Sequence, residues 1–337
     1  MPKELTWFET NKDLMDYLRQ TYFDDTLSTR PVSFKSVDLT FDVASNNREL
    51  VDSLDLLFSV DPVQFSPVSS PSLLFTDKYN KESLVLGGVI PEVETKHVGF
   101  IDYESNQAIV FGKSFGLFKS VVVGLASFQL ESQNYHPAHA SLFEIAGRSI
   151  IMTGGHKAGK STSLFHMIYL AQQQGIQDLK LLTDDWFVIN SKGIARSLDD
   201  SLSITPDFFQ EFPYLNPGLN VKQALSENVK KFYLDPDNVY GPKTKIFSAQ
   251  PNYLVLLEPV DREELIISPN IKVVSQLLVD ATNHMPDGNQ DRVHQHINYW
   301  NSFLSGVKVL SFDTRHCGNV IENYESLFKT IMGEENV

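Results

Sequence analysis

Nine consecutive residues of the 337-residue chain have the types and spacing of a phosphate-binding loop and the start of the helix that follows it. Such loops have the pattern G-x-x-x-x-G-K-[ST], in which glycines let backbone N–H groups approach phosphate oxygens closely. We expect Lys160 to reach the β- and γ-phosphates of a nucleotide and Ser161 to bind Mg²⁺ through its hydroxyl. The predicted nucleotide-binding residues are Gly154, Gly155, His156, Lys157, Ala158, Gly159, Lys160, Ser161 and Thr162.

The segments on either side of this loop have the patterns that its function requires. Residues 149–153 form an apolar run, typical of a buried strand. A helix is predicted over about residues 161–174, because apolar side chains recur there with helical spacing, as at Leu164, Phe165 and Ile168. The N-terminus of that helix would add partial positive charge beside a bound anion. A chance match to the pattern is the alternative, and the strand and helix argue against it.

Two adjacent aspartates, Asp184 and Asp185, follow an apolar strand predicted at residues 179–183. In phosphate-loop folds one carboxylate at such a strand end can hold Mg²⁺, and another can accept the proton of an attacking hydroxyl. We assign Asp184 to the metal and Asp185 to the base, although the two roles can be exchanged. The alternative is an acidic turn, which is how we interpret Asp199 and Asp200, because no apolar strand precedes them.

The wider pattern predicts an α/β protein with two domains. Residues 1–130 would form a small mixed α/β domain, and residues 131–337 would form the domain that contains the phosphate loop. The elements expected in the first are a helix near 14–22, a strand near 37–43, a helix near 50–58, a loop over 61–72, a hairpin of 98–103 and 107–111, and an apolar helix over 117–128. Those expected in the second, besides the three named above, are a strand at 142–146, a hairpin of 186–190 and 193–197, a strand at 253–257, helices near 273–279 and 293–304, a strand at 307–312 and a last helix from about 319.

Three segments together resemble the HPr kinase/phosphorylase family, whose fold is related to that of phosphoenolpyruvate carboxykinase. Residues 139–147 look like the family's histidine, first strand and tight turn, and residues 149–161 look like its second strand and phosphate loop. Residues 182–185 are similar to the family's strand that ends in two aspartates. The three segments follow one another in the family's order. A small N-terminal domain before such a core also resembles HPr-kinase-related proteins of unassigned substrate.

This resemblance implies a fold and a role for each matching residue. The fold would be a small N-terminal mixed α/β domain followed by a P-loop kinase domain of the HPr kinase/phosphoenolpyruvate carboxykinase type. His139 would orient the acidic pair or stabilise transferred charge, and without the resemblance it would be interpreted as an ordinary, partly buried histidine. Lys160 would hold the phosphates, Ser161 the metal, and Asp185 would act as base. The family's later glycine-rich signature is not found in this sequence, so the acceptor stays open.

Composition limits the expected partners and compartment. The chain has 28 Lys and Arg against 42 Asp and Glu, a net charge of −14 that disfavours nucleic acid and anionic membranes. Its single cysteine, Cys317, rules out a disulfide within the chain and fits a reducing compartment. There is no apolar signal segment, and the most apolar run, near 121–125, is too short to span a bilayer. We expect a cytoplasmic protein.

His294 and His296 could suggest a metal-binding pair, but their spacing does not let both bind one metal ion. Two residues apart on a predicted helix, the side chains do not face each other, so we expect both at the surface.

The residues therefore predict a Mg²⁺-requiring kinase that transfers the γ-phosphoryl group of ATP, or of another nucleoside triphosphate, to a hydroxyl. The acceptor would be a peptide, a protein serine or a small metabolite. Two alternatives share the loop: a nucleotide-binding regulator that does not catalyse, and a simple NTPase in which water replaces the hydroxyl. Whether the protein forms a homo-oligomer is left open.

Overall fold

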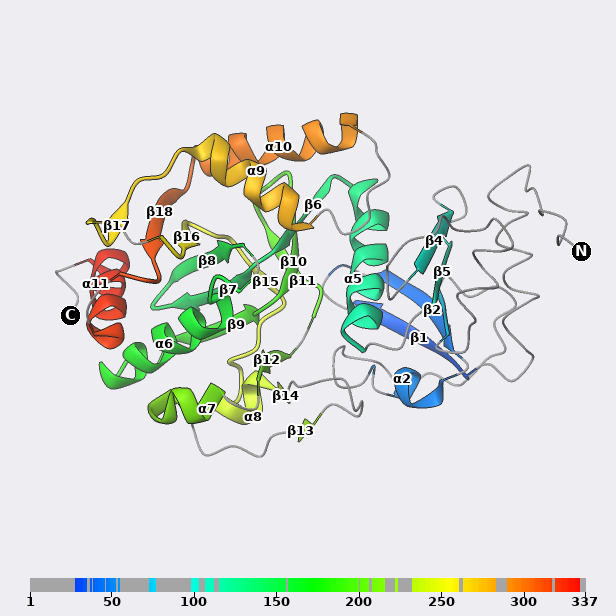
Figure 1. Cartoon of the computed structure of the whole chain (residues 1–337), viewed down its shortest axis with the longest axis horizontal. Coiled ribbons are helices and arrows are strands. Elements are labelled where there is room, and N and C mark those ends of the chain that lie inside the picture. The colour runs from blue at the N-terminus through cyan, green and yellow to red at the C-terminus, as the bar shows by residue number, and fades with distance from the viewer. Residues whose placement is uncertain are drawn as a thin grey trace, which may run out of the picture. The chain divides into compact units, whose positions relative to one another are not determined.

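The computed structural model has helices and strands interspersed along the chain, which confirms the predicted α/β class (Figure 1). The chain divides into two compact units, which we describe separately. The first consists of Met1–Ser33, Asp38–Leu125 and Leu225–Val229, and the second of Phe34–Val37, Ala126–Ala224 and Lys230–Val337. The structure describes residues 28–34, 37, 39–45, 47–52, 54, 73–76, 98–102, 107–111, 115–155, 157–199, 201–205, 208–215, 222–223, 232–260, 263–282, 290–316 and 319–333. The helix expected near 14–22 and the loop expected over 61–72 lie outside these residues.

The first unit holds a five-stranded mixed sheet with the strand order β1-β2-β3-β5-β4. β4 and β5 pair antiparallel, with Val98 opposite Phe111, so the predicted hairpin is confirmed. β3 lies parallel to both β2 and β5. The elements are β1 (Ser28–Phe34), β2 (Leu39–Ser45), α2 (Arg48–Asp52), β3 (Leu73–Thr76), β4 (Val98–Asp102) and β5 (Gln107–Phe111).

The apolar helix expected over 117–128 is α5 (Phe115–Glu131). Its side chains Phe118, Val122 and Leu130 are fully buried. The division between the two units falls inside this helix, after Leu125.

A six-stranded sheet with the order β17-β18-β16-β8-β7-β9 forms the centre of the second unit. β8, β16 and β18 are parallel, so their carboxyl ends lie at one edge of the sheet. β7 is antiparallel to β8 and to β9, which brings the carboxyl end of β9 to the same edge. A tight turn at Ala146 and Gly147, both with positive φ, joins β7 to β8. The strands are β7 (Ser141–Ile145), β8 (Arg148–Gly154), β9 (Leu179–Thr183), β16 (Tyr253–Glu258), β17 (Ile266–Ile267) and β18 (Lys308–Asp313).

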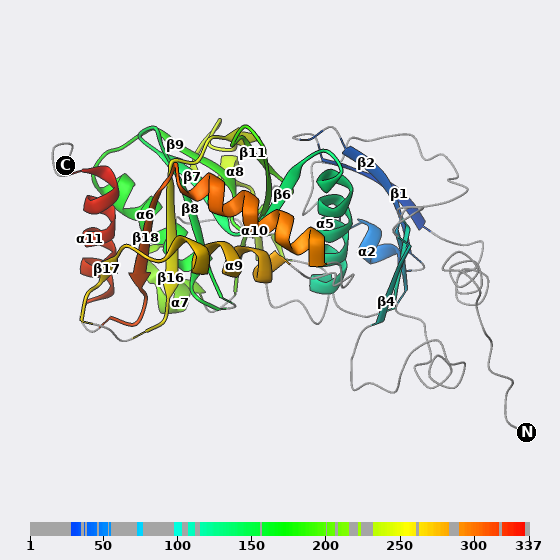
Figure 2. The same ribbon diagram turned by 90° about the horizontal axis from the view of Figure 1, so that it is seen from above.

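Helices bury both faces of this sheet. Ile150 and Met152 of β8 belong to the core shared with α6 and α11, whereas Ile151 belongs to the core shared with α9 and α10. Figures 1 and 2 show these helix pairs on opposite sides of the sheet. Burial on both faces explains the continuous apolar run that predicted β8. The helices, all expected from the sequence, are α6 (Lys160–Gln173), α9 (Ile271–Thr282), α10 (Gln290–Leu304) and α11 (Val320–Met332).

Two smaller antiparallel sheets complete the second unit. One has the order β15-β11-β10-β6 and contains the predicted hairpin of β10 and β11. β6, which the sequence analysis did not predict, pairs with β10 and places His139 opposite Trp186. The other has the order β12-β14-β13. Their strands are β6 (Tyr135–His139), β10 (Trp186–Asn190), β11 (Ala195–Ser197), β15 (Ser248–Ala249), β12 (Leu202–Ile204), β13 (Lys222–Gln223) and β14 (Phe232–Leu234); short helices are α7 (Phe208–Glu211), η1 (Pro213–Leu215) and α8 (Pro236–Tyr240).

None of the helices in the described part of the chain is both long and apolar enough to cross a membrane.

Candidate functional site

The glycine-rich loop, residues 154–161, joins the end of β8 to the start of α6. Gly154 is required by close packing, because a Cβ atom there would lie 2.6 Å from the carbonyl oxygen of Leu257 and 2.8 Å from Cβ of Ala158. Gly159 is the N-cap of α6 and has a φ of 93°, a conformation that favours glycine. The loop is thus shaped by its own backbone and by the neighbouring strand β16. His156 lies outside the described residues.

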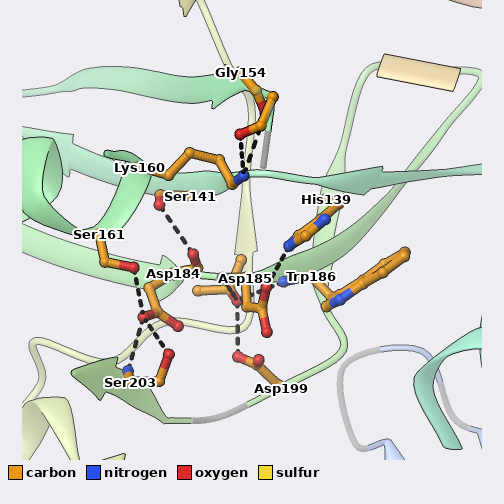
Figure 3. A network of polar contacts seen from close by, with 12 residues as sticks. His139, Ser141, Gly154, Lys160, Ser161, Asp184, Asp185, Trp186, Asp199 and Ser203 are labelled. Carbon is orange, nitrogen blue, oxygen red and sulfur yellow. Dashed lines mark hydrogen bonds and ion pairs between the residues drawn. The ribbon is translucent and has the colours of Figure 1, made fainter. Parts of the chain in front are cut away.

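The side chain of Lys160 folds back over this loop (Figure 3). Its Nζ donates to the carbonyl oxygen of Gly154 at 3.3 Å and to that of Gly155 at 3.5 Å. These are long contacts to neutral acceptors, so an anion entering the loop can replace them with stronger, charge-assisted hydrogen bonds. Thr162, the third residue of α6, is half-buried. The ammonium group of Lys160 thus places a positive charge beside the backbone of the glycine-rich loop.

Asp184 is buried, with 2% of its surface exposed, and its carboxylate points at the start of α6. Its Oδ2 accepts from the backbone N–H of Ser203 at 2.7 Å, from the Ser203 hydroxyl at 3.2 Å and from the Ser161 hydroxyl at 3.4 Å. The hydroxyl of Ser141 donates to the backbone carbonyl of Asp184 at 3.0 Å. The structure therefore brings together the two residues predicted to hold Mg²⁺, although 23 positions separate them in the chain.

Asp185 pairs with His139 on the other side of the same turn. His139 Nε2 and Asp185 Oδ1 are 2.7 Å apart, and the two side chains are 24% and 20% exposed, so solvent or a substrate can reach the pair. The imidazole stacks on Trp186, with ring centroids 4.9 Å apart and an interplanar angle of 3°. The pairing of β6 with β10 explains this arrangement, since it sets His139 directly opposite Trp186.

Asp199, which the sequence placed in an acidic turn, lies between β11 and β12, but its side chain is buried. It is 1% exposed and accepts a hydrogen bond from the Thr183 hydroxyl at 2.8 Å, whereas Asp200 lies outside the described residues. The chain leaving β11 returns to the end of β9, and this long-range path has no local pattern in the sequence. Ser203 was missed for the same reason. Thr183 did carry a local signal, because a threonine just before the turn can accept from backbone N–H groups two and three residues later.

The expectation for the His294 and His296 pair holds for one member only. His294 is exposed, as expected, but His296 is 8% exposed, so its predicted surface position is wrong. Two helical positions differ by about 200°, and this rotation places one side chain in solvent and the other in the protein interior.

A buried cluster surrounds His296 and consists of Glu131, His136, Arg292, His296 and Tyr299; we call it the His136 cluster. The Nδ1 atoms of His136 and His296 are 2.8 Å apart, and His296 Nε2 lies 3.3 Å from Glu131 Oε2. Both Arg292 Nε and Nη2 donate to the Glu131 carboxylate, the latter at 2.7 Å. His136 stacks on Tyr299, with centroids 3.7 Å apart.

Protonation equilibria follow from this packing. Burial, and then the neighbouring His296, lower the pKa of His136 to about 4, against a smaller opposing effect of Glu131. Burial raises the pKa of the Glu131 carboxyl, but hydrogen bonds from Arg292 and His296 outweigh it, so that the net pKa is lowered. The cluster is therefore a neutral histidine beside a paired carboxylate at neutral pH.

The donor set at the loop suits Mg²⁺ bound together with phosphate. Within the described part of the chain, no three His, Cys, Asp or Glu side chains are grouped so that they could hold a metal ion. Ser161 and Asp184 offer one hydroxyl and one carboxylate, both hard oxygen donors. Mg²⁺ at phosphate sites takes one or two protein ligands and completes its shell with waters and phosphate oxygens, so these residues fit it.

A scan against models of protein families gives no match, and a search of curated protein sequences gives none either. The function must therefore be argued from the geometry of the site.

Proposed function

We propose that this protein is an ATP-dependent kinase of the P-loop, HPr-kinase-like class, which transfers a γ-phosphoryl group to a hydroxyl. One observation carries the proposal: Ser161 of the glycine-rich loop and Asp184 of the acidic turn meet at 3.4 Å, with Asp185 adjacent. Two patterns that were recognised separately in the sequence converge at one edge of the six-stranded sheet. A phosphate loop followed by a carboxylate at a strand end is what phosphoryl transfer requires.

The loop and α6 would bind the triphosphate. Backbone N–H groups of residues 154–161 and the positive end of α6 favour an anion, and Lys160 adds a full positive charge. Ser161 and Asp184 would hold Mg²⁺, which neutralises developing negative charge on the phosphates. These contacts do not distinguish ATP from a nucleoside triphosphate with another base.

Asp185 would act as the base. As the oxygen of the acceptor hydroxyl bonds to the γ-phosphorus, the bond from that phosphorus to the β,γ-bridging oxygen breaks, and the hydroxyl proton passes to the Asp185 carboxylate. His139, 2.7 Å from Asp185, would donate its Nε2 proton to the carboxylate and so fix its orientation. The partial exposure of both side chains supports an acceptor that enters from solvent.

The acceptor would be a peptide, a protein serine or a small metabolite, and the acidic chain argues against nucleic acid. A single cysteine fits a reducing, cytoplasmic setting.

Label transfer tests the proposal. Wild-type protein and Asp185→Asn are incubated with Mg²⁺, γ-labelled ATP and host extract, and labelled acceptors are identified. We expect Asp185→Asn to lower the transfer rate by about 10² to 10⁴ while ATP affinity is kept, because a hydroxyl is a poor nucleophile without a base. Equal transfer by both proteins would refute the assignment of Asp185. Binding without transfer would support a regulator, and phosphate release that does not need extract would support an NTPase.

A further inference from the structure

The turn that carries both aspartates is organised by the hydroxyl of Thr183. This hydroxyl accepts from the backbone N–H of Asp185 at 3.1 Å and from that of Trp186 at 3.2 Å. Thr183 thus fixes the backbone from which the side chains of Asp184 and Asp185 diverge, one toward Ser161 and the other toward His139.

The direction of these hydrogen bonds depends on Asp199. A threonine hydroxyl has one proton to donate and two lone pairs with which to accept. The Thr183 hydroxyl donates to Asp199 Oδ1 at 2.8 Å, so this contact takes its only proton. Both lone pairs of Thr183 are then directed to the two N–H groups of the turn. An amide in place of the carboxylate can rotate and donate to Thr183 instead, which would remove this constraint.

Asp199 is itself held rigidly. It is 1% exposed, and its backbone carbonyl accepts from the hydroxyl of Ser197, the last residue of β11. β10 begins directly after Asp185 and pairs with β11, which ends two residues before Asp199. The same pair of strands therefore positions both the acidic turn and Asp199. Its carboxyl group lies beside the turn that carries Asp184 and Asp185 (Figure 3), where its contact with Thr183 fixes the direction of a hydrogen bond.

We propose that Asp199 is a positioning residue of the phosphoryl-transfer site, acting through Thr183 to hold Asp184 and Asp185 in place; this inference rests on the function proposed above. A displacement of about 1 Å between reacting groups can cost about 10²-fold in rate. The loss should therefore appear in the maximal transfer rate. The affinity for ATP depends on the loop and Lys160, so it should change little.

The experiment measures label transfer from γ-labelled ATP into host extract over a series of ATP concentrations, with Mg²⁺ present. The variants are Asp199→Asn, Thr183→Val, Thr183→Ser and the double variant Asp199→Asn/Thr183→Val. Asp235→Asn is the matched control, because this exposed carboxylate also accepts from a backbone N–H, at the N-cap of α8. Binding of Mg²⁺–ATP and thermal unfolding are measured for every variant, so that rates refer to folded protein.

We expect Asp199→Asn and Thr183→Val each to lower the maximal rate by about 10- to 100-fold, with the KM for ATP within about threefold of wild type. Thr183→Ser, which keeps the hydroxyl, should recover most of the loss. The double variant should be little worse than either single variant, because both break one chain of hydrogen bonds.

Two results would overturn the inference. One is a maximal rate for Thr183→Val and Asp199→Asn equal to that of Asp235→Asn; if Asp199→Asn does not fold, Thr183→Val alone decides. The other is a full loss of rate in Thr183→Ser. This variant keeps the hydroxyl and removes only the methyl group, so such a loss would mean that Thr183 acts through its shape and not through its hydroxyl. Wild type and Asp185→Asn, run in the same assay, separate the two claims: if the wild type transfers no label, the proposed function fails, whereas if only Asp185→Asn loses transfer, the function stands and the role of Asp199 falls.

Discussion

Two histidines of one short strand, His136 and His139 of β6, lie in opposite environments. Residues three apart on a strand point to opposite faces, so His139 reaches the acidic turn, whereas His136 reaches α10. His139 is 24% exposed at its side chain and pairs with a carboxylate that solvent can also reach. His136 is 5% exposed and lies in the His136 cluster. The residue type is the same, and the face of the strand decides what it can do.

The neighbours of the two histidines differ in how much surface they leave to solvent. In the His136 cluster, Glu131 accepts from both Arg292 nitrogens, and Tyr299 covers the imidazole of His136. These contacts join the end of α5 to β6 and α10. At the acidic turn, Asp185 and His139 keep part of their surface in solvent. An acceptor hydroxyl can therefore approach there.

Replacing His139 tests this comparison most strongly. We expect His139→Asn to lower label transfer by about 10²- to 10³-fold, the usual cost of losing one oriented donor at a reacting centre. Mg²⁺–ATP affinity should be kept, because His139 touches Asp185 rather than the loop. His294→Asn is the matched control, since His294 is exposed on α10. Transfer within about threefold of wild type in His139→Asn would make both histidines of β6 structural and end the distinction between them.

A second test concerns the glycine-rich loop, whose shape is set by its backbone, whereas the His136 cluster is held by contacts between side chains. In Gly154→Ala the new methyl group would lie 2.6 Å from the Leu257 carbonyl oxygen, so β8 and β16 or the loop must shift. We expect a loss of about 1 to 3 kcal/mol in the free energy of unfolding, as overpacking usually costs. Mg²⁺–ATP affinity should fall at least tenfold. Gly155→Ala is the control within the same loop, because nothing beyond its chain neighbours lies within 4 Å of the added Cβ.

Chemical denaturation and equilibrium binding measure the two effects. If Gly154→Ala binds Mg²⁺–ATP as tightly as Gly155→Ala does, then the shape of the loop at Gly154 is not what binds phosphate.

Much of the fold was predictable because local patterns dictate it. The apolar runs of β7, β8 and β9 and the helical spacing of α6 gave their positions to within a few residues. These elements carry Ser161, Asp184 and Asp185, so the main part of the candidate site followed from them. By contrast, β6 begins Tyr-His-Pro and lacks the alternation that marks a strand; its pairing with β10 stabilises it.

The missed residues owe their places to contacts between distant segments. The acidic turn predicted at Asp199 gave no sign that its side chain is buried, because that burial depends on a partner, Thr183, which lies 16 positions earlier. His296 was predicted at the surface because its spacing from His294 does not suit a metal pair, and that spacing gives no sign of Glu131, whose carboxylate lies 3.3 Å from His296 Nε2. Ser203 is held by β12, a three-residue strand too short for periodicity to reveal. Buried polar residues are where sequence patterns carry the least information.

The smallest expected effect is on the pH dependence of the free energy of unfolding, and it tests the burial of His136. The pKa of His136 is about 4 in the folded protein against 6.5 for an ordinary histidine, so the unfolded chain binds more protons between these values. Stability from this group is therefore complete above pH 6.5 and is lost as pH falls toward 4. We expect His136 to account for about 1 to 2 kcal/mol of the stability that the wild type loses between pH 7 and pH 5.

The lowered pKa of His166 acts in the same direction over this range, so the wild-type loss will not vanish when His136 is removed; the lowered pKa of Glu131 acts only below its ordinary value of 4.5. His136→Asn should flatten the dependence of unfolding free energy on pH, even though losing the stack on Tyr299 lowers stability at every pH. The comparison is thus made on the difference between urea denaturation at pH 7 and at pH 5, with His294→Asn as the exposed control. Equal pH differences in the wild type and in His136→Asn would mean that His136 titrates as freely in the fold as in the unfolded chain, and its burial would then not separate it from His139.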